Sequence, residues 1–176
     1  MIDLETLGTS PGCVVLSIGA VEFDDTDILK TFHVHIDPES SVDHGLEMDV
    51  RTVFWWFDQS DEARAALSND KALNLERAVF ELRNAFQWEG KQVWCNGAAF
   101  DFPILKAIVQ KVGKQLPWAY YEEMDMRTVK NMVGKTGWKQ HQVPATLKHD
   151  ALADAIGQAK TMQKYMASCK VSCKAA

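Results

Sequence analysis

The chain has 176 residues, of which 47% are hydrophobic, and its formal net charge is −5. This size suits one compact domain over 1–176, and no window approaches the roughly 20 apolar residues that a membrane span requires. Because the first residues lack the basic start and apolar run of a leader, we expect a cytoplasmic protein without membrane contact, ending in a flexible tail at 168–176. The four cysteines are too sparse for a disulfide framework, and Cys169 and Cys173 lack the partners of a zinc site.

Charge is unevenly distributed along the chain. Residues 1–100 carry 7 basic and 18 acidic side chains, whereas residues 101–176 carry 12 basic and 6 acidic ones. A bound polyanion should therefore meet the C-terminal part, although ordinary patchiness of surface charge explains the same numbers equally well.

The first elements in chain order are strands. Asp3 and Glu5 belong to a short first strand, and residues 13–23 and 28–36 are rich in β-branched and apolar types. In the third strand His33 and His35 alternate with the apolar residues, so we expect both histidines to face solvent.

Helices dominate the rest of the chain. They are predicted near 49–57, after a Ser60 cap, over 72–87, from Pro103 to about 112, and after His149, with a short buried strand at 92–95. Strands followed by mixed helices and strands predict an α/β fold with a mixed central β-sheet flanked by helices.

Two carboxylates stand two residues apart on the first strand. Asp3 and Glu5 therefore leave the same face of the sheet and repel each other. A hard divalent cation with oxygen ligands would relieve this repulsion. Taken alone, the pair fits a solvated strand end better.

Asp101 adds a third carboxylate, at a junction between strand and helix where loops commonly meet ligands. Its alternative role is an N-cap for the helix that contains Pro103, and the sequence by itself favours that role.

The segment from His149 to Asp154 is the most informative. At about 100° per residue, side chains five positions apart on one helix diverge by some 140°. A shared site therefore requires His149 to precede the helix, with Asp150 as the N-cap and Asp154 on the first turn.

These segments together resemble the DEDDh 3′-to-5′ exonucleases, the group of oligoribonuclease, ribonuclease T and polymerase proofreading subunits. The resemblance runs almost end to end, and small phage and bacterial members look most similar. It rests on the ordered motifs Asp3-x-Glu5, Asn96-x-x-x-Phe100-Asp101 and His149-x-Ala151-x-x-Asp154.

The resemblance implies a ribonuclease H-like fold and a two-metal mechanism. Asp3 would bridge two divalent cations, Glu5 and Asp154 would bind the first, and Asp101 would act through water. Magnesium or manganese suits such an all-oxygen ligand set. His149 would be the general base, since an imidazole can accept a proton from water near neutral pH.

Family likeness also suggests substrate contacts. Thr6, Leu7 and Asn96 would contact the nucleotides at the 3′ end, with plain packing as the alternative for Thr6 and Leu7. Trp55 and Trp56 are neighbours on a helix and cannot both face the core, so one could stack on a base.

Basic residues gather before His149. Basic and aromatic residues together are typical of a groove that binds single-stranded nucleic acid, and a solvated loop is equally plausible. The residues are Lys135, Trp138, Lys139 and Lys148. Arg127 could hold a phosphate or pair with Asp125 or Glu123.

The expected reaction is release of nucleoside 5′-monophosphates from single-stranded DNA or RNA with a free 3′ end. The resemblance also points to a homodimer. The main alternative is a catalytically inactive nucleic-acid-binding or polymerase-associated module of the same fold. The sequence does not decide between DNA and RNA.

Overall fold

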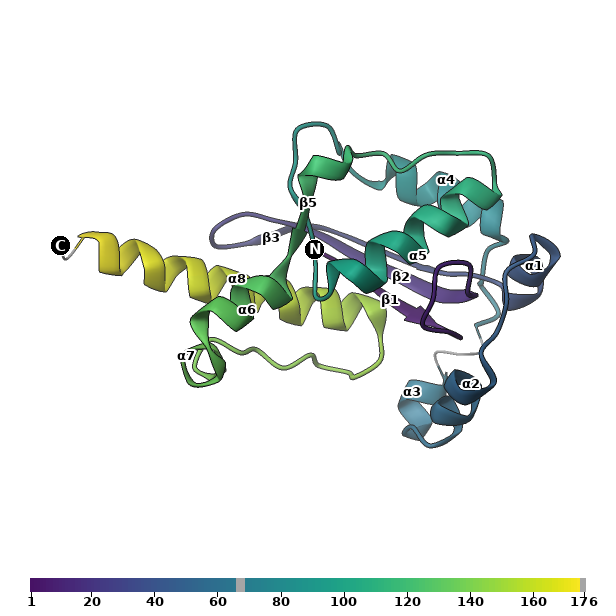
Figure 1. The fold of residues 1–176 in the computed structure, drawn as a ribbon, viewed down its shortest axis with the longest axis horizontal. Coiled ribbons are helices and arrows are strands. Elements are labelled where there is room, and N and C mark those ends of the chain that lie inside the picture. Colours follow the sequence, from purple (N-terminus) through teal and green to yellow (C-terminus); the bar gives the residue numbers. More distant parts are fainter. Residues whose placement is uncertain (66–68, 175–176) are drawn as a thin grey trace.

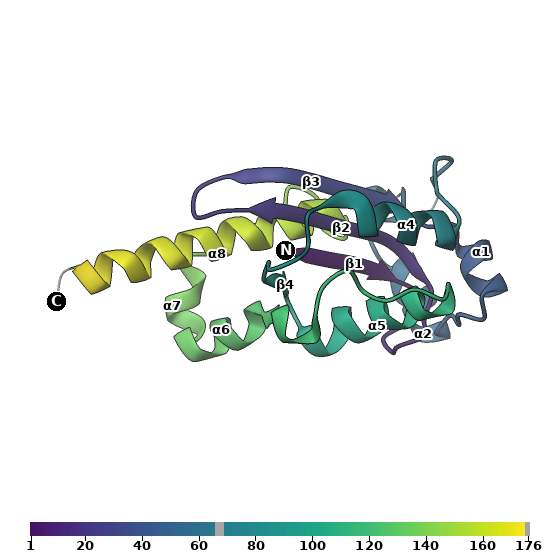
Figure 2. The same cartoon turned by 90° about the horizontal axis from the view of Figure 1, so that it is seen from above.

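The sheet of the protein is built from two hydrogen-bonded pieces. The computed structural model describes residues 1–65 and 69–174 (Figure 1). Strands β1, β2 and β3 form an antiparallel sheet in that order, and β4 pairs in parallel with β5. Strand β4 lies beside β1 (Figure 2), so the two pieces together have the predicted mixed character. The strands are β1 (Ile2–Thr6), β2 (Val15–Phe23), β3 (Ile28–His35), β4 (Val93–Cys95) and β5 (Glu123–Asp125).

Helices flank both faces of the sheet. Helix α8 packs against β1, β2 and β3, while α4 and α5 pack against each other and against β3 and β1 respectively. The predicted α/β class is confirmed, and a small sheet flanked by helices is consistent with a ribonuclease H-like fold. The helices are α1 (Pro38–Asp43), α2 (Val50–Phe57), α3 (Asp61–Ala65), α4 (Leu75–Ala85), α5 (Ala98–Lys111), α6 (Met126–Val133), α7 (Lys135–Lys139) and α8 (Ala151–Lys174), with a 3-10 turn η1 (Tyr120–Glu122).

Strand β1 has an apolar and an acidic face. Ile2 and Leu4 are buried in the main core, which also includes the apolar residues of α4 and α5. Asp3 and Glu5 alternate with them and so lie on the other face, toward α8. This alternation places two carboxylates beneath a helix rather than in solvent.

Gly19 on β2 allows α8 to come this close. Asp3 pairs with Gly19 across the sheet, and a Cβ at Gly19 would overlap the backbone of Ala151 at the start of α8. Only glycine lets the helix backbone rest directly on the strand at this point. The first turn of α8, with Asp154, is thereby brought onto the acidic face of β1.

The predicted exposure of His33 and His35 is wrong. His33 pairs with Gly19 and His35 with Ser17, so both histidines share the sheet face of Asp3 and Glu5. Helix α8 covers this face and leaves both histidines only half-exposed. Burial lowers the pKa of His33, and the two rings lie 4.6 Å apart.

The observed starts of the helices agree only in part with those predicted from the sequence. Asp150 accepts from the backbone N–H of Ala153 at 2.8 Å, as predicted for the N-cap of α8. Asp101 is not an N-cap, because α5 starts earlier, at Ala98, with Gly97 in the capping position. The short elements α1, α7 and β5 were not predicted, since each is too short to show a clear period. Glu123, Asp125 and Arg127 were expected on one helix, but α6 starts only at Met126 and the two acidic residues belong to β5.

The C-terminal region is helical further than expected. Helix α8 continues through Lys174, into the segment predicted to be a flexible tail, and the mobility of that segment stays a prediction. Cys13, Cys95 and Cys169 are free thiols, whereas the side chain of Cys173 lies outside the described part of the chain. Among the described helices, none is long and apolar enough to cross a membrane.

Candidate active site

Four carboxylates from three segments of the chain converge at one end of β1. Asp3 and Glu5 come from β1, Asp101 from the first turn of α5, and Asp154 from the first turn of α8. Asp3 interacts electrostatically with the other three, and Glu5 with Asp101 and Asp154. The structure therefore brings together the carboxylates that the sequence motifs singled out.

Burial raises the pKa of every member of this cluster, and repulsion by other members adds to the effect for Asp3 and Glu5. Burial is the main cause for Asp3, whose pKa is raised well above its usual range, with Asp101 and Glu5 adding to the effect. Burial, followed by the charges of Asp154, Asp150 and Asp101, raises the pKa of Glu5 to about 8. Burial raises the pKa of Asp101 to about 7 and also raises that of Asp154. Such a cluster is unfavourable when fully ionised unless positive charge is added.

The nearby positive charges of Arg127 and Lys148 lower the pKa of Asp101 and of Asp154 respectively, but burial outweighs them. The groups in direct contact with the carboxylates are neutral. The side-chain amide of Gln158 donates to Asp3 Oδ1 at 2.7 Å, and the backbone N–H of His149 donates to Asp154 Oδ2 at 3.1 Å. The buried thiol of Cys95 lies beside Asp101 and lowers the pKa of that carboxyl group. These bonds hold the carboxylates in place without neutralising them.

His149 stands immediately before α8, as predicted. Its φ of 61° is in the left-handed region, which is unusual for a residue with a side chain and turns the chain sharply into the helix. A ring nitrogen of His149 and carboxylate oxygens of Glu5 and Asp154 all lie within 4.8 Å of one another. The imidazole is thus already directed into the site.

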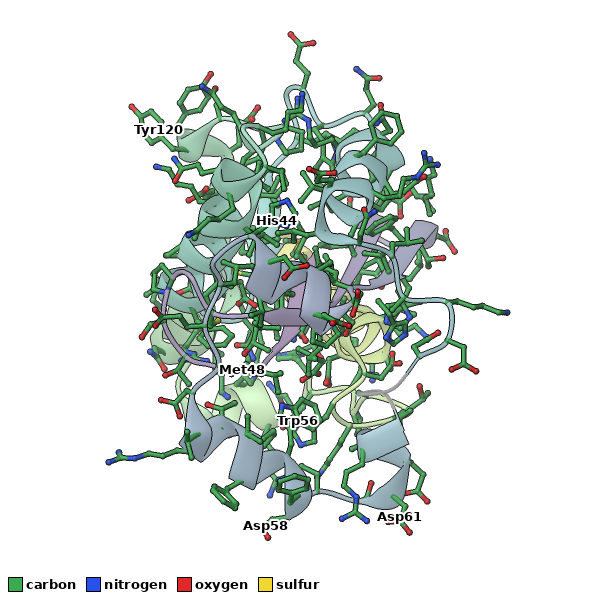
Figure 3. All side chains as sticks on the ribbon, turned by 90° about the vertical axis from the view of Figure 1, so that its right-hand side faces the viewer. His44, Met48, Trp56, Asp58, Asp61 and Tyr120 are labelled. Atoms are coloured by element: carbon green, nitrogen blue, oxygen red, sulfur yellow. The ribbon has the colours of Figure 1, made fainter. Side chains whose placement is uncertain are left out.

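Two tryptophans of α2 surround the His149 ring. The ring centroids of Trp55 and Trp56 lie 4.9 and 5.9 Å from that of His149. Trp56 is buried and donates from Nε1 to the carbonyl oxygen of Thr6 at 2.9 Å, whereas Trp55 is 43% exposed. As predicted, only one of the two faces the core. Figure 3 looks onto this end of the molecule, with Trp56 between Met48 and Asp58.

The residues fit a divalent cation. Glu5, His149 and Asp154 can each offer one ligand atom at the mutual distances just given, and Asp3 and Asp101 add buried carboxylates beside them. Hard cations such as magnesium and manganese prefer carboxylate oxygens, and their charge would offset the repulsion within the cluster. The sequence predicted that a histidine before the helix could reach the site of Asp154, and the imidazole does lie close to Glu5 and Asp154.

The predicted substrate residues lie around this cluster with different exposure. Thr6 and Leu7 are buried, and the Thr6 hydroxyl donates to the carbonyl oxygen of Gly8 at 2.6 Å. This arrangement supports the packing role for both, and substrate contact by either stays a prediction. Asn96 is half-buried and lines a cavity together with Asp154.

The predicted basic and aromatic groove is only partly present. Trp138 is buried and packs on Tyr165, with ring centroids 5.6 Å apart, so it offers no stacking surface. Lys139 and Lys148 are exposed, and the side chain of Lys135 lies outside the described part of the chain.

Sequence reasoning missed two contacts of the cluster. Gln158 follows Asp154 by four residues and therefore shares its helix face, a spacing that could have identified it. Cys95 ends the predicted strand before Asp101, but nothing in the sequence indicates that its thiol meets that carboxylate.

Comparison with known proteins identifies a nuclease family. The family described as "3'-5' exoribonuclease Rv2179c-like domain" matches residues 1–166. The chain belongs to this family. It is also similar to a protein of Enterobacteria phage T4 named "Exodeoxyribonuclease", at 26% identity over 157 residues, covering 73% of this chain and 68% of the phage protein.

Membership in the Rv2179c-like exoribonuclease family gives the carboxylate cluster a chemical context. The family and the phage relative both carry the name of an exonuclease, which supports nuclease activity on nucleic acid. The metal-binding geometry of Glu5, His149 and Asp154 is compatible with the divalent cations that such enzymes generally use.

Proposed function

We propose that the protein is a metal-dependent 3′-to-5′ exonuclease of the DEDDh type, which releases nucleoside 5′-monophosphates from single-stranded DNA or RNA. The observation that carries the proposal is the convergence of Asp3, Glu5, Asp101 and Asp154 with His149 at one point of the fold. One domain over 1–176 would contain the whole site.

The four carboxylates would hold two magnesium or manganese ions. Asp3 lies among the other three carboxylates, which suits the role of a bridging ligand. Glu5 and Asp154 would complete the first site, and Asp101 would contribute through water. When bound, such a pair of ions stabilises the charge on the attacking and leaving oxygens of an in-line displacement.

His149 would act as the general base. Its ring lies beside Glu5 and Asp154 and is packed against Trp55 and Trp56, which supports a role in taking a proton from an attacking water. The neutral imidazole removes a proton from that water as its oxygen attacks phosphorus, and the bond to the 3′ oxygen of the next nucleotide breaks. The leaving group is that 3′ oxygen, which takes up a proton on the shortened strand, and the terminal nucleotide departs as a nucleoside 5′-monophosphate.

The direction of attack would be set by residues next to the cluster. Thr6 and Leu7 follow Glu5 directly on the chain, and Asn96 precedes Asp101 by five residues, so we propose that these three contact the terminal nucleotide. A homodimer is a further expectation from family likeness, and light scattering tests it without bearing on the chemistry.

A digestion experiment tests the proposal. DNA and RNA strands labelled at the 5′ end are incubated with the protein and manganese, and the products are read as ladders. We expect stepwise shortening from the 3′ end and resistance of strands that end in a 3′-phosphate. Cleavage of circular single strands at the same rate would show an endonuclease, and no cleavage of any strand would favour a catalytically inactive binding module.

A further inference from the structure

A groove leads away from the carboxylate cluster toward α6. A cavity of about 250 Å³ beside the cluster is lined by Asn96, Lys130, Lys148, Asp154 and other residues. A second hollow of about 500 Å³ is lined by Asn96, Arg127, Lys130, Asn131 and Gly134. Because Asn96 and Lys130 belong to both, the two hollows adjoin and form one path from the cluster to the surface.

The cations along this groove act on the carboxylate cluster only at a distance: Arg127 lowers the pKa of Asp101 and Lys148 lowers that of Asp154. Arg127, Lys130 and Lys148 are exposed, and within residues 1–65 and 69–174 none of them forms an ion pair. The two expected partners of Arg127 are engaged elsewhere. Asp125 caps α6 by accepting from the backbone of Arg127 and from the hydroxyl of Thr128.

Glu123, the other acidic residue considered for Arg127, accepts instead from the indole N–H of Trp118 at 3.3 Å. Exposed cations next to a strongly acidic cluster would ordinarily attract carboxylates of their own protein. Here that attraction acts without a direct ion pair among the described residues, so the N–H donors of these side chains stay available to an anionic ligand.

The guanidinium of Arg127 is held in a fixed position. Its Nη2 donates to the carbonyl oxygen of Asn96 at 2.8 Å and would lie 3.1 Å from a Cβ at Gly97. Gly97, with φ of 137°, is the residue that lets the guanidinium rest against the backbone. Since a guanidinium has five N–H donors, the remaining ones can serve a ligand in the hollow, with little loss of side-chain freedom on binding.

We propose that this groove, defined by Asn96, Arg127, Lys130 and Lys148, binds the phosphates of the substrate strand on the 5′ side of the scissile bond. The inference rests on the proposed function, because a strand attacked at its 3′ end must leave the site in the 5′ direction. Arg127 provides a fork of donors for one phosphate and Lys130 a mobile charge for the same or the next.

The groove recognises the backbone rather than the bases. The residues around the larger hollow include no aromatic side chain, and Trp138, which lines the smaller cavity, is buried. Stacking platforms are the usual means by which proteins hold the bases of single strands. Among the described residues that line the groove, none offers such a stacking surface. We therefore expect that affinity for the substrate strand depends on strand length and salt concentration, and does not depend on the bases on the 5′ side of the scissile bond.

The test compares Lys130→Gln with Lys114→Gln, the same change at an exposed lysine beyond the C-terminal end of α5. KM and kcat are measured with manganese on strands of two to ten nucleotides at several salt concentrations. For Lys130→Gln we expect KM of the longer strands to rise about fivefold, with kcat little changed. The slope of log KM against log salt should fall by about 0.7, the value for one phosphate contact on a single strand.

Arg127→Lys keeps the charge but removes the donor fork, so it should raise the KM of longer strands as well. Lys114→Gln should keep the wild-type KM and salt slope. If the wild-type enzyme degrades strands and Lys130→Gln retains its length dependence and salt slope, this inference fails and the proposed function stands. If the wild-type protein degrades no strand, both fail together.

Discussion

Glu5→Gln should make the metal-free protein more stable at alkaline pH. Burial and the charges of Asp154, Asp150 and Asp101 raise the pKa of Glu5 to about 8, against 4.5 for a free side chain. Because the folded state binds the proton more tightly, it is favoured below pH 4.5, and this contribution is lost as pH rises through the folded pKa. Glutamine has nearly the same shape but no titrating proton, so the variant does not lose stability as the pH rises.

The magnitude follows from linkage. A rise in pKa from 4.5 to about 8 corresponds to roughly 5 kcal/mol in unfolding free energy, of which roughly 3 kcal/mol falls between pH 5.5 and 8. For a chain of 176 residues, that difference corresponds to about 6 to 12 °C in Tm. Manganese should reverse the effect in the wild-type protein, since it binds the ionised carboxylate.

The assay is thermal unfolding in chelator at pH 5.5 and 8, repeated with manganese. Glu89→Gln is the matched control, because Glu89 is exposed and its substitution should leave the pH dependence of Tm unchanged. Glu5→Gln should show a smaller fall in Tm between the two pH values and a smaller gain from manganese. A Tm below wild type at pH 8 in chelator would refute the reasoning and make Glu5 a structural acceptor.

Three further substitutions test the parts of the site. His149→Ala should lower kcat by about 10² to 10⁴ if the imidazole is the general base; near-normal turnover would refute that role. Gly19→Ala should cost roughly 3 kcal/mol or more, measured by urea unfolding, because the new Cβ overlaps the backbone of Ala151; wild-type stability would show that α8 can move away freely. Gln158→Leu should weaken manganese binding about 10- to 100-fold in calorimetry, since Asp3 loses its hydrogen bond; unchanged affinity would mean that Asp3 needs no support.

The sequence predicted the elements that show a period or a cap. The strands with β-branched residues, the amphipathic α4 and the start of α8 at Asp150 were placed within a few residues, because alternation and capping are local properties. The five-residue separation of His149 and Asp154 also predicted correctly that the histidine precedes the helix, since a continuous helix would separate the two side chains.

The predictions that were wrong or missing concern contacts between residues that are distant in sequence. His33 and His35 have the alternation of a half-exposed strand, but α8, more than a hundred residues later, covers their face. Asp101 was expected to cap α5 because it precedes Pro103, whereas the helix starts three residues earlier. Gln158 and Cys95 were missed because their roles are defined only by what they touch in the folded protein.

The basic residues before His149 show the same limit. Composition alone grouped Trp138 with exposed lysines, although its ring is buried against α8. Conversely, an ion pair for Arg127 was as plausible in sequence as a phosphate contact. In the structure Asp125 and Glu123 accept hydrogen bonds from other groups, and Arg127 forms no ion pair within the described residues.

The most direct test of the account is the metal dependence of hydrolysis in wild type and Asp154→Asn. Release of mononucleotides from a 5′-labelled strand is measured during titration with manganese, beside Asp58→Asn as a control at an exposed carboxylate. We predict saturable activation of the wild type and of the control, complete loss in chelator, and little activity of Asp154→Asn at any manganese concentration. Undiminished release in excess chelator, or wild-type turnover by Asp154→Asn, would contradict a mechanism based on these carboxylates.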